Sequence, residues 1–396
     1  DIGARLVGVN ARDLSTFELD RDLFGRLAES IPTDAVKIAE SAVLTPADVA
    51  HYRGAGADVV LIGEALVTND PVTTTKGVFV LYEGSFGQPQ SYDYGFIDTG
   101  LDTVFSNVYQ NSNGGSALNS FPNGMILSGN ELFISAQGTF GQPGSMYKIN
   151  STSNQLITSS PSIGNNPYNF AFANGNIYIS NSGSDYVKLT DMNFGTVIDS
   201  LSVGFNPADI LFAGGNVFVG KQTFTFENSL AVINASNQVS KIFFQGPPVS
   251  IALNSGKVYV STFGYKKIFV VDASTALVVD SISTSVSQAG IGYLASGSAG
   301  TLYVLGTDTA FQYMQGVSMY KVDLVNKTID PGFNVSVTGT DVIYGIDYDE
   351  VENKIYTAIA KGNINGEVRV YDPSGTLLKT YTDIGGKYPR RFAFKY

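Results

Sequence analysis

Residue types that commonly carry out chemistry are scarce in this sequence. It contains no Cys and a single His, His51, so thiolate catalysis, disulfides, Cys-based metal sites and multi-His metal sites are excluded. A Ser-His-Asp triad is excluded from residues 77–396 because they contain no His. Two carboxylates, Asp347 and Asp349, alternate with Tyr348 and are expected on one side of a strand, but no other feature supports glycoside hydrolysis by such a pair. We predict that the protein is not an enzyme and uses no cofactor and no metal.

Single Asp residues follow several short apolar stretches in the second half of the sequence. Because they are far apart along the chain, we expect them to cap turns rather than to bind calcium together. These residues are Asp191, Asp272, Asp323 and Asp372. His51 falls within a predicted helix, where we expect it on the surface.

Aromatic and amide side chains are concentrated in the loops between predicted strands, in stretches such as Thr139-Phe-Gly-Gln-Pro and Asn165-Asn-Pro-Tyr168. Aromatic rings provide contact area at low entropic cost, and amides provide hydrogen bonds. The pattern indicates a platform for a large, flat, partly polar small molecule. The alternative is that the rings pack between structural repeats and that the Asn-Pro pairs only set turns. The candidate ligand-binding residues are Phe86, Phe140, Tyr168, Phe224, Phe226, Phe263, Tyr265, Phe311, Tyr313, Tyr344 and Arg390.

The composition favours many short strands joined by tight turns. Charged residues make up 15% of the chain, against about 25% in typical soluble domains, whereas Gly (43), Phe (25) and Tyr (22) are abundant. The net charge is −11 and there is no basic patch, which argues against nucleic acid as a partner. No apolar run approaches the 18 residues that a membrane span requires, so no span is predicted.

One strand motif, an aliphatic residue followed by an aromatic residue and a short apolar tail, recurs seven times. The copies begin at Val78, Leu132, Ile177, Val217, Val258, Leu302 and Ile355. They lie 40 to 54 residues apart, a period typical of β-propeller blades. Related strands precede and follow most copies, which gives four strands in each repeat. The sequence therefore predicts an all-β, seven-bladed β-propeller in which the motif is the second strand of each blade.

The two ends of the repeat region complement each other. The copy at Val78 has no inner strand in front of it, and Tyr388–Tyr396 has no second strand after it. The stretch Arg391-Phe-Ala-Phe matches Asn169-Phe-Ala-Phe172 in an earlier repeat. We expect the C-terminal strand to complete the first blade and close the ring, which removes open sheet edges. The propeller is thus assigned to residues 77–396.

Residues 1–72 differ in composition and pattern. They contain only three of the chain's Phe and Tyr residues, and short apolar runs alternate with helical patterns. The expected strands are Arg5–Asn10, Val36–Glu40 and Val59–Gly63, and the expected helices are Asp22–Ser30 and Pro46–Tyr52. Strands that alternate with helices predict a small α/β segment with a parallel sheet. Residues 73–76 are expected to form a linker.

Three motifs in residues 1–72 resemble the last three βα units of indole-3-glycerol phosphate synthase, a (βα)8 (TIM) barrel of tryptophan biosynthesis. The motifs are Gly8-Val-Asn-Ala-Arg-Asp-Leu14, Ile38-Ala-Glu-Ser41 and Val60-Leu-Ile-Gly-Glu64. The resemblance implies that two positions face the substrate and that three approach its phosphate. The substrate positions are Asn10 and Glu40, and the phosphate positions are Ser41, Gly63 and Glu64.

This segment departs from the family in two respects. The family usually has Gly where this sequence has Ala42. The five units that carry the family's catalytic Lys and its acid Glu are missing from this sequence. We therefore expect a partial barrel, fused to the propeller and without activity of its own, although the family itself is cytoplasmic.

The repeat region, with its opening Gly77-Val-Phe-Val-Leu-Tyr-Glu-Gly-Ser-Phe-Gly87, resembles YncE-like propellers of Bacteroidetes cell surfaces. Some members of that group are lipoproteins of the BtuG kind, which capture cobalamin for a TonB-dependent outer-membrane transporter. The resemblance implies a cobalamin-like corrinoid as ligand, such a transporter as partner, and a location at the cell surface or in the periplasm. Two other functions stay open. One is an enzyme of tryptophan biosynthesis, and the other is a structural or adhesive propeller that binds protein or glycan.

Overall fold

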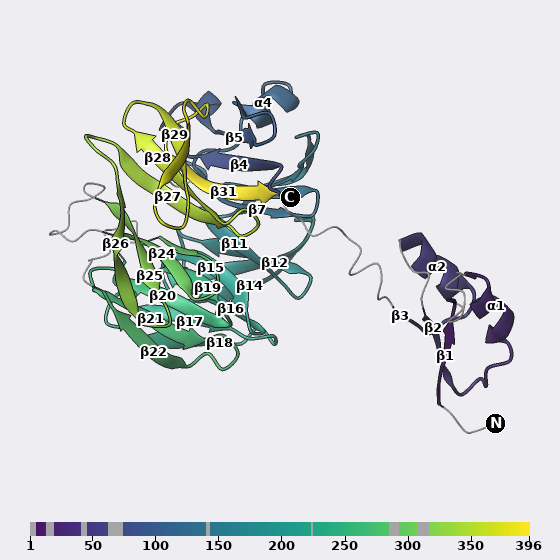
Figure 1. Ribbon diagram of the computed structural model, residues 1–396. Helices are drawn as coiled ribbons and strands as arrows, with labels where there is room; N and C mark the ends of the chain where they lie inside the picture. Colours follow the sequence, from purple (N-terminus) through teal and green to yellow (C-terminus); the bar gives the residue numbers. More distant parts are fainter. Residues whose placement is uncertain are drawn as a thin grey trace. The chain divides into compact units, whose positions relative to one another are not determined.

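The chain folds into two compact units, residues 1–73 and residues 74–396. The computed structural model describes residues 5–12, 20–40, 46–61, 74–139, 143–222, 225–284, 293–306 and 317–396. Figure 1 shows both units, which we describe one at a time. Among the described residues, no helix has the length and apolar character needed to cross a membrane.

The first unit is a small parallel sheet with two helices. Its strands are β1 (Leu6–Asn10), β2 (Val36–Glu40) and β3 (Val59–Leu61), in that order across the sheet, and its helices are α1 (Leu23–Ala28) and α2 (Pro46–Gly54). One face of the sheet packs on the helices, where Val9, Ala39, Phe24 and Tyr52 are buried together. The alternation of strands and helices expected for this α/β segment is confirmed.

The second unit consists of seven four-stranded antiparallel sheets, which are the blades of a propeller. We name the strands of each blade A to D from the centre outward. Blade 1 contains β31 (Pro389–Lys395), β4 (Gly77–Tyr82), β5 (Asp93–Asp98) and β6 (Thr103–Phe105); blade 2 contains β7 (Pro122–Ser128), β8 (Glu131–Ala136), β9 (Gly144–Asn150) and β10 (Leu156–Gly164); blade 3 contains β11 (Pro167–Ala173), β12 (Asn176–Asn181), β13 (Tyr186–Asp191) and β14 (Val197–Ser202); blade 4 contains β15 (Pro207–Ala213), β16 (Asn216–Lys221), β17 (Ser229–Ile233) and β18 (Val239–Phe243).

The remaining blades follow the same order. Blade 5 contains β19 (Pro248–Asn254), β20 (Lys257–Thr262), β21 (Lys267–Asp272) and β22 (Val278–Ser283); blade 6 contains β23 (Leu294–Ser296), β24 (Thr301–Gly306), β25 (Ser318–Asp323) and β26 (Thr328–Ser336); blade 7 contains β27 (Val342–Asp349), β28 (Lys354–Lys361), β29 (Ile364–Tyr371) and β30 (Leu377–Tyr381). The predicted count of seven blades is confirmed.

The recurring sequence motif is strand B in every blade. In β12, for example, Ile177 and Ile179 pack on the core shared with blade 2, whereas Tyr178 packs on the core shared with blade 4. Each blade is covered on both faces by its neighbours, so strand B is apolar almost throughout rather than alternating.

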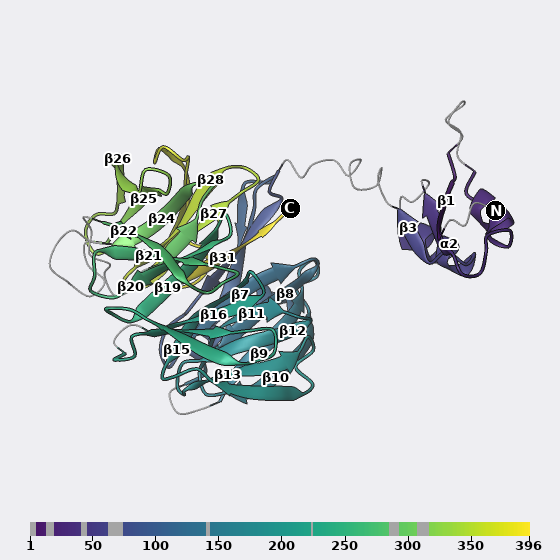
Figure 2. The same cartoon turned by 90° about the horizontal axis from the view of Figure 1, so that it is seen from below.

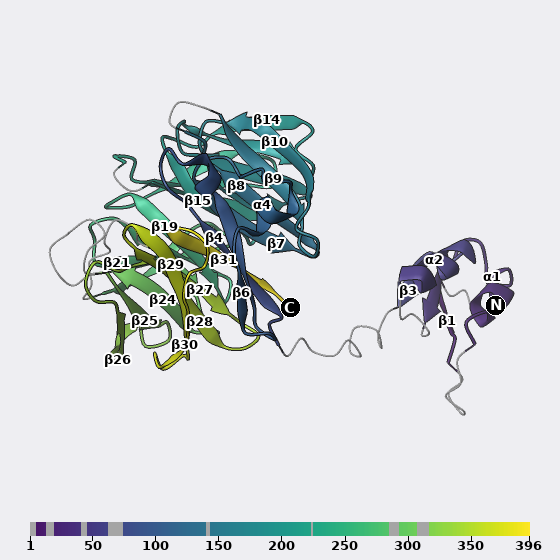
Figure 3. The same ribbon diagram turned by 90° about the horizontal axis from the view of Figure 1, so that it is seen from above.

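The C-terminal strand closes the ring as expected. Strand β31 pairs antiparallel with β4, with Phe392 opposite Val80. Figure 1 shows the yellow β31 beside the blue β4. Each strand A also contacts the strand A of the next blade, around all seven blades, and Figures 2 and 3 show the blades from below and from above.

The wide spacing between the first two copies of the motif has a structural cause. A short helix, α4 (Val108–Ser112), lies in the connection from β6 to β7. The buried Asp93 accepts hydrogen bonds from the backbone N–H groups of Tyr109 (2.9 Å) and Gln110 (3.0 Å), which fixes the start of this helix. A 3₁₀ turn, η1 (Pro89–Ser91), lies in the loop between β4 and β5.

Candidate functional site

The candidate site lies where the seven A strands begin. Five of these strands start with Pro, and a register shift follows within the next two or three residues. The residue two positions after each Pro, or its equivalent, lies on the wall of the central channel. These seven residues are Arg391, Gly124, Asn169, Asp209, Ser250, Tyr293 and Gly345 in blades 1 to 7, and we call them the channel ring. The D–A and B–C loops surround it on the same face of the propeller.

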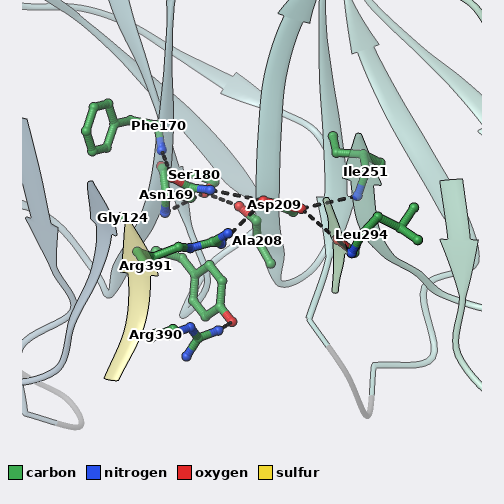
Figure 4. Close-up of polar contacts among 12 residues, drawn as sticks. Gly124, Asn169, Phe170, Ser180, Ala208, Asp209, Ile251, Leu294, Arg390 and Arg391 are labelled. Carbon is green, nitrogen blue, oxygen red and sulfur yellow. Dashed lines mark hydrogen bonds and ion pairs between the residues drawn. The ribbon is translucent and has the colours of Figure 1, made fainter. Parts of the chain in front are cut away.

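Asp209 of blade 4 holds the channel ring together. Its Oδ1 accepts a hydrogen bond from Nδ2 of Asn169 at 3.0 Å, and its Oδ2 accepts from Oγ of Ser250 at 3.1 Å and from the backbone N–H of Ile251 at 3.2 Å. Oγ of Ser250 accepts in turn from the backbone N–H of Leu294 at 3.1 Å. Figure 4 shows Asp209 between Asn169 and Ile251. One carboxylate therefore links blades 3, 4, 5 and 6, and its buried charge is fully hydrogen-bonded.

Arg391 reaches Asp209 from the C-terminal strand. Nη2 of Arg391 lies 3.5 Å from Oδ1 of Asp209, and Figure 4 shows Arg390 and Arg391 extending from β31. Blades 1 and 4 are not neighbours in the ring, so this contact crosses the central channel. Gly124 and Gly345 occupy the ring positions on either side of Arg391. A Cβ on Gly345 would lie 2.0 Å from the carbonyl oxygen of Arg390, so no larger residue fits there.

Arg390 lies inside a cluster of aromatic rings. Its guanidinium is 5.2 Å from the ring centroids of Tyr168 and Tyr293 and 5.7 Å from that of Tyr344, distances at which a cation is attracted to a ring face. It pairs with the carboxylate of Glu83 and donates to the hydroxyl of Tyr168. The hydroxyl of Tyr344 donates to the same carboxylate at 2.8 Å. With its amide turned to satisfy its neighbours, Asn123 also accepts from Arg390 at 2.8 Å.

These contacts close the mouth of the channel with side chains. Arg390 is 8% exposed and Tyr344 is 7% exposed, so neither offers much surface to a ligand. Deeper in the wall, burial raises the pKa of Asp347 to about 6, and the positive charge of Arg391 acts in the opposite direction. Among the residues that the structure describes, these side chains fill the centre of this face, and we call them the closed floor.

Exposed rings project from the loops around this floor. Phe86 is 75% exposed, Phe205 57% and Tyr265 40%, and Phe226 is fully exposed. Phe86, Phe226 and Tyr265 lie in B–C loops, and Phe205 lies in a D–A loop, so all four belong to the same face. The arrangement can present flat apolar surface to a ligand on this face.

The structure brings three of the predicted ligand-binding residues into direct contact: Tyr168, Tyr344 and Arg390. Phe86, Phe226 and Tyr265 are exposed rings outside this cluster, and Phe263 is half-buried. Four predicted residues, Phe140, Phe224, Phe311 and Tyr313, lie outside the described residues.

Sequence reasoning missed Glu83, Tyr293, Asp209 and Arg391. A usable signal exists, because five of the channel-ring residues stand two places after a Pro that opens an A strand and differ in type from blade to blade.

A family model matches residues 76–395 and therefore most of the sequence. The chain belongs to this family, described as Domain of unknown function (DUF5074). Solved structures share the fold of the DUF5074 propeller. A Quinonprotein alcohol dehydrogenase-like protein from Bacteroides thetaiotaomicron aligns with a TM-score of 0.62 and 13% identity over 81% of this chain and 78% of that chain. A functionally unknown protein from Desulfotomaculum acetoxidans aligns with a TM-score of 0.59 and 10% identity over 81% of this chain and 99% of that chain.

A second family model, Indole-3-glycerol phosphate synthase, matches residues 1–76. The enzyme of that name from Leifsonia xyli is 76% identical over 74 residues, which are 19% of this chain and 28% of the relative. The enzyme from Saccharopolyspora erythraea is 53% identical over 70 residues, 18% of this chain and 26% of the relative. The chain thus spans about a quarter of the length of these curated relatives. The resemblance of the first unit to part of this enzyme is confirmed.

The Asp residues at the end of strand C, or directly after it, cap turns in the DUF5074 propeller. Each accepts at least two hydrogen bonds from backbone N–H groups of the following residues, as Asp372 does from Ser374 and Thr376, both at 2.9 Å. The same pattern holds at Asp191, Asp272 and Asp323. Asp349 caps the turn after strand β27 in the same way and also bonds to Thr75. The carboxylate of Asp349 is therefore engaged in these hydrogen bonds. It is not free to act with Asp347 as a pair of carboxylates.

In the first unit, two of the implied substrate positions are adjacent. Asn10 and Glu40 are register partners at the carboxyl ends of β1 and β2. Oδ1 of Asn10 accepts from the backbone N–H of Arg12 at 2.9 Å, and the side chain of Glu40 lies over Gly8. The implied phosphate positions Ser41, Gly63 and Glu64 lie outside the described residues.

Proposed function

We propose that the DUF5074 propeller captures a large, flat, partly polar small molecule, of the corrinoid kind, on the face formed by its D–A and B–C loops. The observation that carries this proposal is the set of exposed rings, Phe86, Phe205, Phe226 and Tyr265, around a closed floor. Large exposed rings gathered on one face are typical of binding surfaces. Because the floor is closed, a ligand would lie across the face rather than enter the channel.

The polar character of this face supports a ligand with amide or hydroxyl groups. The loop from Ser85 to Ser91 contains two Gln residues and no charged residue. The charged side chains at the centre, Arg390 and Glu83, are paired with each other. A corrinoid combines a flat conjugated ring with peripheral amides, which is the chemistry that such a face would recognise. The resemblance to YncE-like surface propellers supports a TonB-dependent transporter as partner and a location at the cell surface or in the periplasm.

Isothermal titration of the full chain with cyanocobalamin tests the proposal. We expect binding at micromolar protein, and we expect the double substitution Phe86→Ala with Phe226→Ala to weaken it about tenfold or more, because stacked rings contribute strongly at binding surfaces. The matched control is Leu277→Ala, since Leu277 is similarly exposed at 64% but lies in a C–D turn on the opposite face. This control should bind like the parent protein.

The absence of heat with cyanocobalamin would remove the corrinoid assignment. Capture of a protein or retardation by a polysaccharide on the same face would then favour an adhesive propeller. We expect no synthesis of indole-3-glycerol phosphate by the chain, because the matched segment spans only 28% of the relative's length.

A further inference from the structure

The residue that precedes the first Pro of strand A has an unusual backbone conformation in four blades. Its φ is +55° at Tyr388 in blade 1, +54° at Phe121 in blade 2, +51° at Asn166 in blade 3 and +52° at Asn206 in blade 4. This left-handed region is unfavourable for residues with a Cβ. A following Pro restricts the residue further, toward extended conformations.

The fold uses the backbone of this residue. The carbonyl oxygen of Phe121 accepts a hydrogen bond from the N–H of Gln137 at 3.0 Å, and that of Asn206 accepts from Gln222 at 2.9 Å. The carbonyl groups of Asn166 and Tyr388 make the equivalent bond. Each bond joins the D–A loop to the B–C loop of its blade. Because the bond involves only backbone atoms, it does not explain the choice of side chain.

The side chains divide the four blades into two pairs. Asn is among the residues that tolerate the left-handed region best, since its short polar side chain can bond locally. Blades 3 and 4 have Asn at this position. Blades 1 and 2 have Tyr388 and Phe121, for which the same conformation is strained. Blades 3 and 4 show that Asn, which is less strained, is compatible with this position. The strain retained in blades 1 and 2 therefore points to a function for the aromatic ring.

The ring of Phe121 supports an exposed ring. Its centroid lies 6.0 Å from that of Phe86 with an interplanar angle of 25°, which is a stacked pair. The ring of Phe121 also contacts the buried ring of Tyr92, with 5.8 Å between the two centroids. Phe86 remains 75% exposed, so the stack fixes Phe86 in place without burying it. We call Phe86 and Phe121 the aromatic shelf.

We propose that the aromatic shelf is the ring-stacking subsite of this face, and that it holds the flat, uncharged face of a ligand over blades 1 and 2, away from the propeller axis. This inference rests on the proposed function and deepens it, because it places the ligand and names the residues that orient it. The neighbouring Gln88 and Gln90 are exposed and supply amide groups at the edge of the shelf. Tyr388 packs on Tyr344 at 5.8 Å, which joins the strained position of blade 1 to the closed floor.

Exchanging the residues at the two equivalent positions tests the inference, because the repeat supplies its own control. We expect Phe121→Asn to leave the thermal midpoint unchanged or to raise it by about 2 °C through relief of strain, while weakening cyanocobalamin binding about tenfold or more. We expect the reverse exchange in blade 4, Asn206→Phe, to lower the midpoint by about 2 °C and to leave binding within twofold of the parent protein. Phe86→Ala should weaken binding as Phe121→Asn does, with the midpoint unchanged.

Two results would overturn the inference. One is parent-like binding by both Phe86→Ala and Phe121→Asn. The other is a midpoint that falls further in Phe121→Asn than in Asn206→Phe, because Phe121 would then be a packing residue. If the parent protein itself does not bind cyanocobalamin, the proposed ligand is wrong. The thermal midpoints of Phe121→Asn and Asn206→Phe then test the subsite without a ligand. An unchanged or raised midpoint in Phe121→Asn supports the view that the strained ring of Phe121 serves the binding of a different ligand.

Discussion

At the residue scale, the site depends on charges that meet only when the ring closes. Arg390 pairs with Glu83 across 307 positions of sequence, and Arg391 reaches Asp209 from the opposite side of the channel. A buried charge without its partner is costly. These pairs therefore favour the closed ring over open arrangements of the same blades.

The carboxyl group of Asp347, in the wall of the channel, makes the stability of the propeller depend on pH. The pKa of its carboxyl is about 6 in the folded protein, against an ordinary value of 3.8, because of burial. Between these values the folded state binds more protons than the unfolded state, so the stability from this group is fully present below about pH 4 and is lost as pH rises through 6. We expect Asp347→Asn to raise the free energy of unfolding at pH 8 by about 1–2 kcal/mol, with no gain at pH 4.

Urea unfolding at pH 4, 6 and 8 measures this effect. The control is Glu350→Gln, an exposed carboxylate close to Asp347 in sequence, for which we expect no such trend. A gain that is equal at all three pH values would show that Asp347 is not titrating, because an uncharged group has no pH-dependent contribution.

Arg390, Tyr168 and Tyr344 could be singled out from the sequence because they stand at repeat positions next to Pro or Gly. Their partners could not, because the repeat gives the register along each blade but not the contacts across the channel. Glu83 and Tyr293 are examples, since each meets Arg390 only through closure of the ring. Phe121 was missed for another reason: its significance lies in a backbone angle, and only comparison with Asn166 and Asn206 reveals it.

At the element scale, the outer D strands protect their open edges by a shared irregularity. In blades 2, 3, 5 and 7 the pairing of strands C and D shifts register near the start of strand D. The residue at each shift is apolar and about half exposed: Ile157, Ile198, Val279 and Leu378. Bulges twist a strand and interrupt its pairing pattern, which hinders edge-to-edge association. The sequence predicted the strands but not these bulges, because hydrophobic alternation does not encode a one-residue insertion.

Strand β31 is the element on which closure depends. Phe392 is buried in it, with its ring 5.9 Å from that of Tyr356 in blade 7. We expect Phe392→Ala to lower the free energy of unfolding by about 3–4 kcal/mol, as large-to-small changes in cores do. Denaturant unfolding measures this loss. Tyr396→Ala, at the exposed end of the chain, should change it by less than about 1 kcal/mol. Equal losses in the two variants would contradict the role of β31 as the closing strand.

At the scale of the whole molecule, the two units have separate cores. Among the described residues, the core around Phe24 and Tyr52 contains only residues of the first unit, and the propeller cores contain only residues of the second. In the first unit, Leu6, Val36 and Leu61 leave apolar surface exposed on the sheet. A parallel sheet is normally covered on both faces, and these three described residues lie where this sheet is uncovered.

The start of the propeller can be located by its hydrogen bonds. Thr75 is buried, and it donates from its backbone N–H to Glu352 at 3.1 Å and from its hydroxyl to Asp349. The backbone N–H of Lys76 donates to the carbonyl oxygen of Lys395 at 2.7 Å. Residues 75 and 76 thus fasten β31, the closing strand, and the turn that follows β27.

We therefore expect residues 74–396, expressed alone, to unfold at the same temperature as the propeller in the full chain, within about 1 °C. Residues 77–396 lack the bonds of Thr75 and Lys76 and should unfold about 2–4 °C lower, which corresponds to roughly 1 kcal/mol in a domain of this class. Differential scanning calorimetry of the three proteins measures both differences. A lower midpoint for residues 74–396 would mean that the first unit stabilises the propeller, and equal midpoints for the two shortened chains would mean that Thr75 contributes nothing. The expected order makes residue 74 the boundary of the propeller and assigns the stability of the chain to its closed ring of blades.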